Sequence, residues 1–486
     1  MPAAPRPIDV SQTPTVEPAD AVATVSAPDT AWARIRPLLV RLHFYAGVFV
    51  GPFILIAAVT GLLYALVPEL DKALTRDQRL VEVVGETTLP LSDQIAAARA
   101  AHPEGTVESV RPPATPEETT RVTLAVDDVA PDYGRTIFVD PYTGQVRGAL
   151  TTYGEWMPVR AWFDEFHRNL HLGALGRNYS ELAASWLWVV ALAGLVLWIG
   201  HRAGTGRLRR ALLPDRGTTG RRRLLSWHGA LGTWVIVGLL GLAITGMTWS
   251  KHAGESIDAI QGALHTRAPA VDTALSGSPA PVHAGHHGAA PAAAEGTELT
   301  ETQALAGVDT VLRAAHDAGL RDPMWLYPPS TLEEGWKVAE RKRDWPTRAD
   351  AVVVDPATGA ITDRVDFASW PTLAKLTDWA IDAHMGVLFG LVNQIVLALV
   401  ALALIVMIVL GYRMWWRRRP VRGGPPTGPR RGALGSLRPH EAVIVVAVLA
   451  AVGWFAPLFG LSLAAFVAVD VALGWWRGRR AETARR

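Results

Sequence analysis

The sequence has 486 residues, of which 49% are hydrophobic and 19 are tryptophan, while the formal net charge is only +2. This apolar share indicates an integral membrane protein rather than a soluble enzyme. The chain contains no cysteine, which excludes iron–sulfur clusters, thiolate catalysis, disulfides and covalent haem attachment through a CxxCH motif.

The chain begins with a Pro-, Ala-, Val- and Thr-rich segment, 1–34, which lacks a basic stretch followed by an apolar core. We therefore expect a disordered cytoplasmic tail and not a signal peptide. Apolar runs of about 18 or more residues predict membrane spans. Four runs qualify: 35–67, 183–201, 224–249 and 384–412. The segment 441–476 is also apolar but is interrupted at Pro457, so we predict a hairpin of two spans, with a re-entrant pair as the alternative.

Arginine is concentrated in three segments, 202–223, 413–440 and the C-terminal tail 477–486. All three fall on one side of the membrane if each predicted span crosses once, and the positive-inside rule makes that side cytoplasmic. Both termini are then cytoplasmic. Because these arginines adjoin the ends of spans, we do not expect them to bind nucleic acid.

The two long segments 68–182 and 250–383 are then extracytoplasmic. Each contains a β-branched run that leads into a turn motif, IFVDPYTG at 137–144 and VVVDPATG at 352–359, which is typical of a strand followed by a tight turn. A stretch with helical periodicity precedes each motif. We therefore predict a small α+β module in each segment. The second is preceded by an Ala/Pro/Gly-rich linker that contains His283, His286 and His287, to which we assign no role.

An internal repeat relates the first and third spans. Residues 41–66 and 224–250 carry a histidine, two glycines and a threonine at the same spacing. The equivalent residues are His43, Gly47, Thr60 and Gly61 in the first copy, and His228, Gly232, Thr245 and Gly246 in the second. The repeat predicts two duplicated helices with one histidine each at the same depth. Small residues also let membrane helices pack closely.

The predicted topology sorts five histidines into two layers. His43 and His228 lie at the cytoplasmic ends of their spans, whereas His167, His171 and His384 lie near the outer ends of theirs. An ionisable side chain within a membrane indicates function, and two facing imidazoles suit axial ligation of haem iron. We therefore predict one haem in each layer.

Four stretches resemble the PepSY-associated transmembrane family: RLHFYAGVFVGPFILIAAVTGLLY, FHRNLHLGALGRNYSELAASWLWV, AHMGVLFGLVNQ and GYRMWWRRRP. The two DPxTG strands resemble PepSY modules, and the resemblance extends over about 35–475. Members of that family include iron-regulated membrane proteins and ferric siderophore reductases that hold two b-type haems, so the resemblance implies the same cofactors here. The expected fold is an α-helical membrane bundle of four core helices plus a C-terminal helical hairpin, with two small α+β modules outside.

The outer ligand set has two alternatives. His167 and His171 are four residues apart, so they would share one face of a helix and only one need bind iron. The match of His171-Leu-Gly to His384-Met-Gly favours His171, whereas the FHR pattern of the family favours His167. Both are kept as candidates.

The chain has no G-x-G-x-x-G motif in a strand–helix context and no P-loop. Its electrons would therefore come from a quinol or a separate flavoprotein. The leading hypothesis is a di-haem electron-transfer protein of the bacterial inner membrane, a membrane ferric reductase that acts on a ferric chelate or siderophore. The rival is a non-catalytic membrane protein whose PepSY modules bind a peptidase or an uptake partner.

Overall fold

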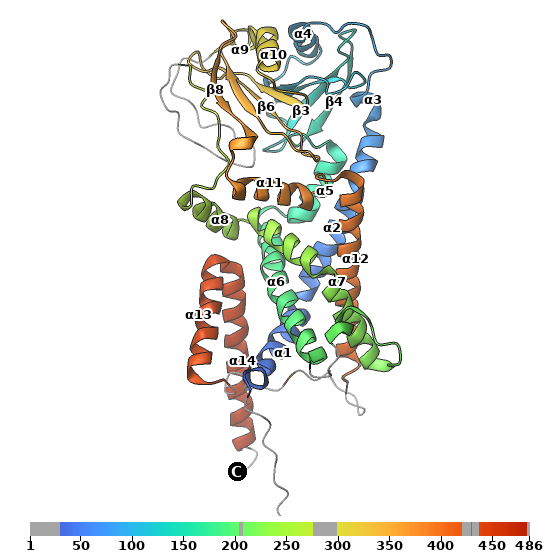
Figure 1. Cartoon of the computed structure of the whole chain (residues 1–486), viewed down its shortest axis with the longest axis vertical. Helices are drawn as coiled ribbons and strands as arrows, with labels where there is room; N and C mark the ends of the chain where they lie inside the picture. The colour runs from blue at the N-terminus through green and yellow to red at the C-terminus, as the bar shows by residue number, and fades with distance from the viewer. Residues whose placement is uncertain (1–29, 204–207, 276–298, 420–428, 430–436, 484–486) are drawn as a thin grey trace, which may run out of the picture.

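The computed structural model describes residues 30–203, 208–275, 299–419, 429 and 437–483. Most of the predicted N-terminal tail, together with His283, His286 and His287, lies outside the described residues. Long helices form a bundle at one end of the molecule and strands form a sheet at the other (Figure 1). Three helices lie between them: α5 (Pro158–Asn169), α8 (His252–Ala263) and α11 (Thr372–His384).

Among the described residues, five helices are long and apolar enough to cross a membrane, so this is a multi-pass membrane protein. They are α2 (Gly51–Leu74), α6 (Gly173–Ala203), α7 (Gly220–Thr248), α12 (Gly390–Trp416) and the Pro457–Trp476 part of α14 (Pro457–Thr483). The 17-residue α13 (Pro439–Phe455) is also apolar. Its length of about 26 Å falls short of a hydrocarbon core of about 30 Å. The predicted six crossings therefore stay a prediction.

The first predicted span is divided into two helices, α1 (Ala31–Phe49) and α2, at Val50. Pro52 lies in the first turn of α2 and has no N–H to donate to the carbonyl of Val48, four residues earlier. The hydroxyl of Tyr412 on α12 donates to that carbonyl instead, at 2.8 Å. The break is therefore stabilised by a side chain from a distant part of the chain, and α12 packs along α2.

The strands of the described ranges form one eight-stranded antiparallel sheet in the order β4-β3-β2-β1-β5-β6-β7-β8. Their bounds are β1 (Thr106–Arg111), β2 (Thr120–Ala125), β3 (Gly134–Val139), β4 (Val146–Thr152), β5 (Met324–Tyr327), β6 (Trp336–Glu340), β7 (Ala351–Val354) and β8 (Ile361–Val365). Two four-strand meanders, one from each outer segment, meet where β1 pairs with β5 through Val110 and Leu326. The sequence predicted two modules but not that their sheets join.

Helices α4 (Leu91–Ala101) and α10 (Val308–Asp317) cover one face of this sheet and share one buried apolar cluster with it. The second module also caps a helix of the first. Pro90 precedes α4 and has no side-chain oxygen, and the carboxylate of Asp309 on α10 accepts the N–H of Leu91 at 2.6 Å.

In the turn motifs, Asp140 and Asp355 each accept backbone N–H groups of their own turn, as the sequence predicts. The shorter elements are α3 (Arg76–Arg79), α9 (Glu301–Leu305) and two 3-10 turns, Leu208–Leu212 and Phe367–Ser369.

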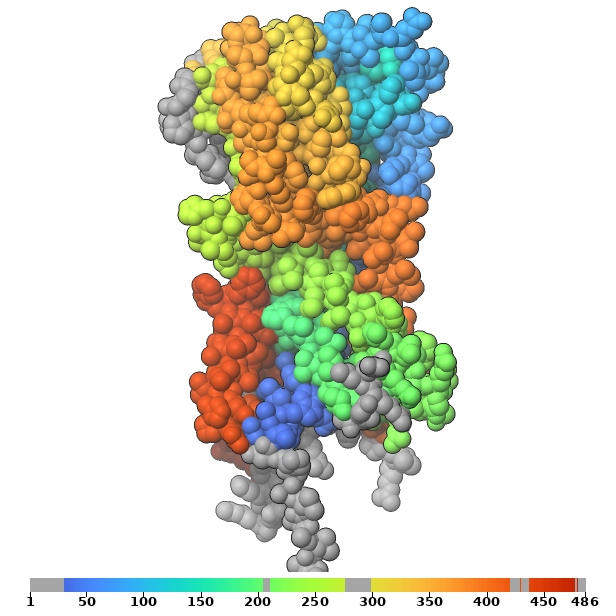
Figure 2. All heavy atoms as spheres, viewed as in Figure 1, coloured from blue at the N-terminus to red at the C-terminus, as the bar shows by residue number. Residues whose placement is uncertain are grey.

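Helices α13 and α14 pack against each other along one side of the bundle (Figure 2). Gly453 and Gly460 allow this approach, since a Cβ on Gly453 would lie 2.9 Å from the Cα of Gly460. The indole N–H of Trp186 on α6 donates to Ser462 at 2.9 Å. Two further ion pairs, Arg34 with Glu441 and Arg41 with Asp470, join the pair of helices to α1.

Candidate functional site

His43 on α1 and His228 on α7 face each other inside the bundle. Their ring centroids are 6.0 Å apart and the ring planes are nearly perpendicular, at 80°. This is the inner pair. The repeat placed these histidines at equivalent positions of the first and third spans, and the structure brings them together.

Each histidine of the inner pair is oriented by a backbone carbonyl of another helix, α6 for His43 and α12 for His228. The Nδ1–H of His43 donates to Val190 on α6, and the Nδ1–H of His228 donates to Met407 on α12, both at 2.9 Å. A carbonyl oxygen can only accept, so Nδ1 carries the proton in both rings. The lone pair of each Nε2 is left for another partner. This is the usual arrangement of a metal-binding histidine.

His167 on α5 and His384 on α11 form the outer pair, with ring centroids 6.4 Å apart and planes at 48°. The Nδ1 of His167 hydrogen-bonds Thr60 on α2, and that of His384 hydrogen-bonds Thr245 on α7. Both threonine hydroxyls already donate to carbonyls of their own helices. They therefore accept from Nδ1–H, and Nε2 again keeps its lone pair.

The repeated Thr-Gly dipeptide thus supports the outer pair. Each copy of the repeat supplies one inner histidine and, 17 residues later, one threonine that orients an outer histidine. The sequence showed the repeated Thr-Gly but gave it no role beyond helix packing. Its partners are 107 and 139 residues away in the chain, which no local pattern reveals.

A glycine lies beside the ring of every paired histidine. A Cβ on Gly194 would lie 2.7 Å from His43, and one on Gly61 would lie 3.0 Å from His167. Gly411 and Gly246 lie beside the other two rings, where a Cβ would approach to 4.0 and 3.9 Å. Gly61 and Gly246 belong to the repeat, whereas Gly194 and Gly411 gave no sequence signal.

His171 does not join either pair. The sequence-based expectation that His167 and His171 share a helix face is wrong, because α5 ends at Asn169 and both Leu170 and His171 have φ of +55°. That left-handed turn carries His171 away from His384. Its ring packs against Trp162 and its Nδ1 lies 3.4 Å from a carboxylate oxygen of Glu165. His201 stacks on Trp198 near the other end of α6.

The spacing within both pairs suits one metal ion between two imidazoles. An imidazole nitrogen binds a first-row metal at about 2 Å and lies about 1.1 Å from its ring centroid, so two opposed ligands have centroids about 6.2 Å apart. The observed separations are 6.0 and 6.4 Å. Aromatic rings enclose the outer pair, since Tyr64 stacks on His167 and Trp249 meets His384 edge-on.

A buried ionic network connects the outer pair to the sheet. Arg343, from the loop after β6, bonds both Glu155 and Asp382, and its side chain is only 12% exposed. Two guanidinium groups approach Trp156: the Cζ atoms of Arg160 and Arg343 lie 3.5 and 5.0 Å from its ring centroid. Burial opposes ionisation of Glu155, but Arg343 and Arg341 hold its pKa at about 2. Glu155 is therefore ionised at neutral pH.

Replacing Arg343 with methionine is expected to destabilise the protein by about 3–5 kcal/mol, because it leaves two buried carboxylates without their partner. Arg341→Met is the matched control: Arg341 also bonds Glu155 but is 51% exposed, so its loss should cost about 1 kcal/mol or less. Thermal unfolding followed by tryptophan fluorescence measures both. Similar losses of stability in the two variants would mean that the network is not what joins the sheet to the bundle.

A family model described as the PepSY-associated TM region matches residues 40–418. The matched range contains all four paired histidines and His171, and it ends before α13. No curated protein matches the chain.

Proposed function

The chain belongs to the family of PepSY-associated TM regions, and we propose that it is a di-haem electron-transfer protein that passes electrons outward to a ferric chelate or siderophore. The observation that carries this proposal is the geometry of the two histidine pairs, with centroids 6.0 and 6.4 Å apart. In all four rings Nδ1 is the donor and Nε2 is free to bind. The cofactors proposed are two haems b.

His43 and His228 would hold the inner haem, and His167 and His384 the outer one. The chain fixes the four rings before any group binds, because each Nδ1–H is committed to an acceptor on another helix. The glycines beside the rings keep that space clear of side chains. Haem ligated by two histidines has no open iron position and supplies one-electron transfer rather than oxygen chemistry.

The two layers are spaced by the helices themselves. His228 and Thr245 lie 17 residues apart on α7, which corresponds to about 26 Å along a helix axis. The inner pair therefore lies toward the arginine-rich ends of the bundle and the outer pair toward the sheet. A quinol or a separate flavoprotein would supply electrons on the arginine-rich side.

The face of the sheet opposite α4 and α10 carries two arginines and Glu118, which pairs with Arg111 at 3.1 Å, and it is the surface on which we propose that an anionic chelate docks. Alternation along β1 places Arg111 on that face, since its neighbour Val110 lies in the apolar core. Its guanidinium lies 5.2 Å from the ring of Trp325 on β5. Arg121 on β2 is nearby: burial and then the charge of Arg111 lower its pKa to about 9, and its Nε has no hydrogen-bond partner among the described residues.

The function test is electron transfer across a sealed membrane. Proteoliposomes loaded with a reductant should reduce an external ferric siderophore, detected as ferrous iron trapped by an external chelator, and protein-free liposomes should not. If proteoliposomes with haem-loaded protein reduced the siderophore no faster than protein-free liposomes, the reductase proposal would be overturned. A folded protein that is colourless after haem-replete expression would favour the rival, a membrane protein whose PepSY modules bind a partner.

His167→Ala is expected to remove about half of the bound haem, whereas His171→Ala should keep all of it. The reason is that only His167 faces His384, while His171 lies against Trp162 and Glu165. The haem-to-protein ratio of the purified variants measures the difference. The reverse result would assign the outer ligand to His171.

We also propose that the arginine-rich ends of the bundle are cytoplasmic and that the sheet lies outside, in the bacterial inner membrane. Alkaline phosphatase is active only outside the cytoplasm. Fusions after Asp140 and Asp355, both next to strands of the sheet, should be active, and fusions after Arg216 and Arg422 inactive. An active fusion after Arg216 would reverse the orientation.

A further inference from the structure

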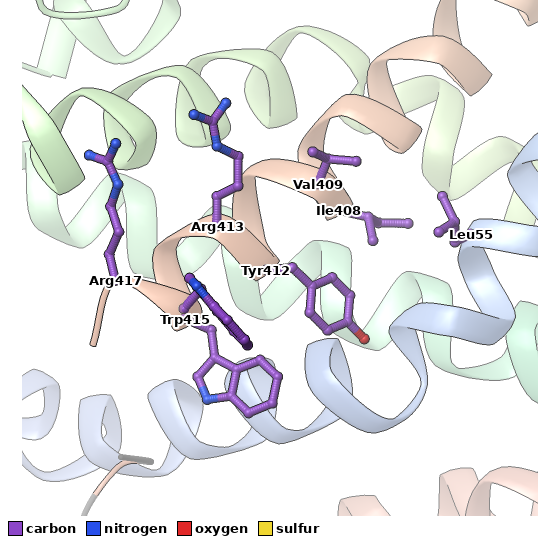
Figure 3. A pocket seen from close by; sticks show the side chains of 8 residues that line it. Leu55, Ile408, Val409, Tyr412, Arg413, Trp415 and Arg417 are labelled. Carbon is purple, nitrogen blue, oxygen red and sulfur yellow. The ribbon is translucent and has the colours of Figure 1, made fainter. Parts of the chain in front are cut away.

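A cavity of about 450 Å³ lies on the surface of the bundle where α2 meets the last turns of α12. Its apolar wall includes Leu55, Ile408 and Val409, and its other end is formed by Arg413, Arg417 and neighbouring tryptophans. Figure 3 shows Arg413 and Arg417 extending to the same side of α12, as expected for residues four apart on a helix. The cavity is thus apolar toward the middle of the bundle and cationic at the helix end.

Arg413 and Arg417 have no acidic partner among the described residues. Within the described parts of the chain, no hydrogen bond or ion pair joins a carboxylate to Arg413, Arg417, Arg418 or Arg221. Asp215, in the loop before α7, pairs with Arg202 instead. Burial, and then the nearby charge of Arg221, lower the pKa of Arg418. Arg413 and Arg417, which line the cavity, and Arg418, the next residue after Arg417, therefore place several positive charges at this end of α12, and an anion would relieve their repulsion.

The start of α7 adds to the positive potential beside Arg417. A Cβ on Gly220, the first residue of α7, would lie 3.8 Å from the Nη1 of Arg417. Thr219 makes no side-chain capping hydrogen bond at this helix start. The free N–H groups and the positive end of the helix dipole therefore point to the region beside Arg417.

We propose that this cavity binds an anionic phospholipid, with its phosphate between Arg413 and Arg417 and an acyl chain against Leu55, Ile408 and Val409. A soluble anion would satisfy the arginines but leave the apolar wall uncovered. A lipid satisfies both, and basic pockets between membrane helices suit anionic head groups. Trp415 lines the cavity near the arginine-rich end of α12, and tryptophan is enriched at membrane surfaces. This site is independent of the proposed haem ligation.

The experiment uses the full-length protein, delipidated in a neutral detergent, with thermal unfolding as the readout. Phosphatidylglycerol should raise the melting temperature of the wild type by several degrees, whereas phosphatidylcholine and inorganic phosphate should not. Arg413→Gln/Arg417→Gln should weaken the apparent affinity for phosphatidylglycerol at least tenfold. The control is Arg36→Gln/Arg223→Gln, which removes the same charge from exposed positions on α1 and α7 and should respond like the wild type.

Val409→Trp is a second variant, which fills the apolar part and keeps both arginines. It should also lose the response, so the test survives if the double arginine variant does not fold. An unchanged response in either cavity variant, an equal loss in the control, or an equal shift with inorganic phosphate would overturn the proposal. The last outcome would indicate a site for soluble anions.

Discussion

His384→Ala is expected to abolish reduction of an external ferric siderophore by proteoliposomes that contain an internal reductant. His384 is half of the outer pair and lies at the end of α11, between the bundle and the sheet. Without it the proposed outer haem would keep only one of its two histidines, while His43 and His228 would be unchanged. The rate at which ferrous iron is formed and trapped should fall to that of protein-free liposomes.

The matched control for this variant is His171→Ala, which changes a histidine on the same side of the bundle that faces neither pair. It should keep the wild-type rate. The inner haem of the His384 variant should still accept electrons from the internal reductant, which shows that the protein is folded. Equal rates for wild type and His384→Ala would refute the reductase function, and an unchanged haem spectrum would remove His384 as a ligand.

His43→Ala or His228→Ala is expected to remove about half of the bound haem and to leave the spectrum of the outer haem intact. The inner pair is supported by α6 and α12, through the carbonyls of Val190 and Met407. The outer pair is supported by Thr60 and Thr245. The groups that hydrogen-bond the inner pair are therefore different from those that hydrogen-bond the outer pair. Each haem should be lost without loss of the other.

The haem-to-protein ratio and a redox titration of each purified variant measure this separation. Either substitution should leave a single reductive step, that of the outer haem. His201→Ala is the control, because His201 stacks on Trp198 and faces neither pair. If a folded His43→Ala protein lost both haems together, the two-layer scheme would be wrong.

The repeat made much of this site predictable. It related His43 to His228 by spacing alone, and the predicted topology assigned His167, His171 and His384 to the other layer. The sequence did not distinguish His167 from His171 as the partner of His384, because the answer depends on where α5 ends. Leu170 and His171 both adopt φ of +55°, and a leucine at the first of these positions does not signal a left-handed turn.

Long-range partners were the part that sequence could not supply. The DPxTG motifs predicted strands and turns, but nothing local specifies that β1 pairs with β5 across more than 200 residues. Pro52 is visible in the sequence, yet the partner that satisfies the carbonyl of Val48 is Tyr412. The glycines beside His43 and His228 likewise become meaningful only when α6 and α12 are packed against the rings.

The most direct test of the central claim is the haem content of the wild-type protein. Protein purified from haem-replete cells should contain about two b-type haems per chain, with a Soret band that sharpens on reduction with dithionite and spectra typical of two histidine ligands. The paired rings, 6.0 and 6.4 Å apart, account for that number. A folded, colourless protein would contradict the assignment of both pairs.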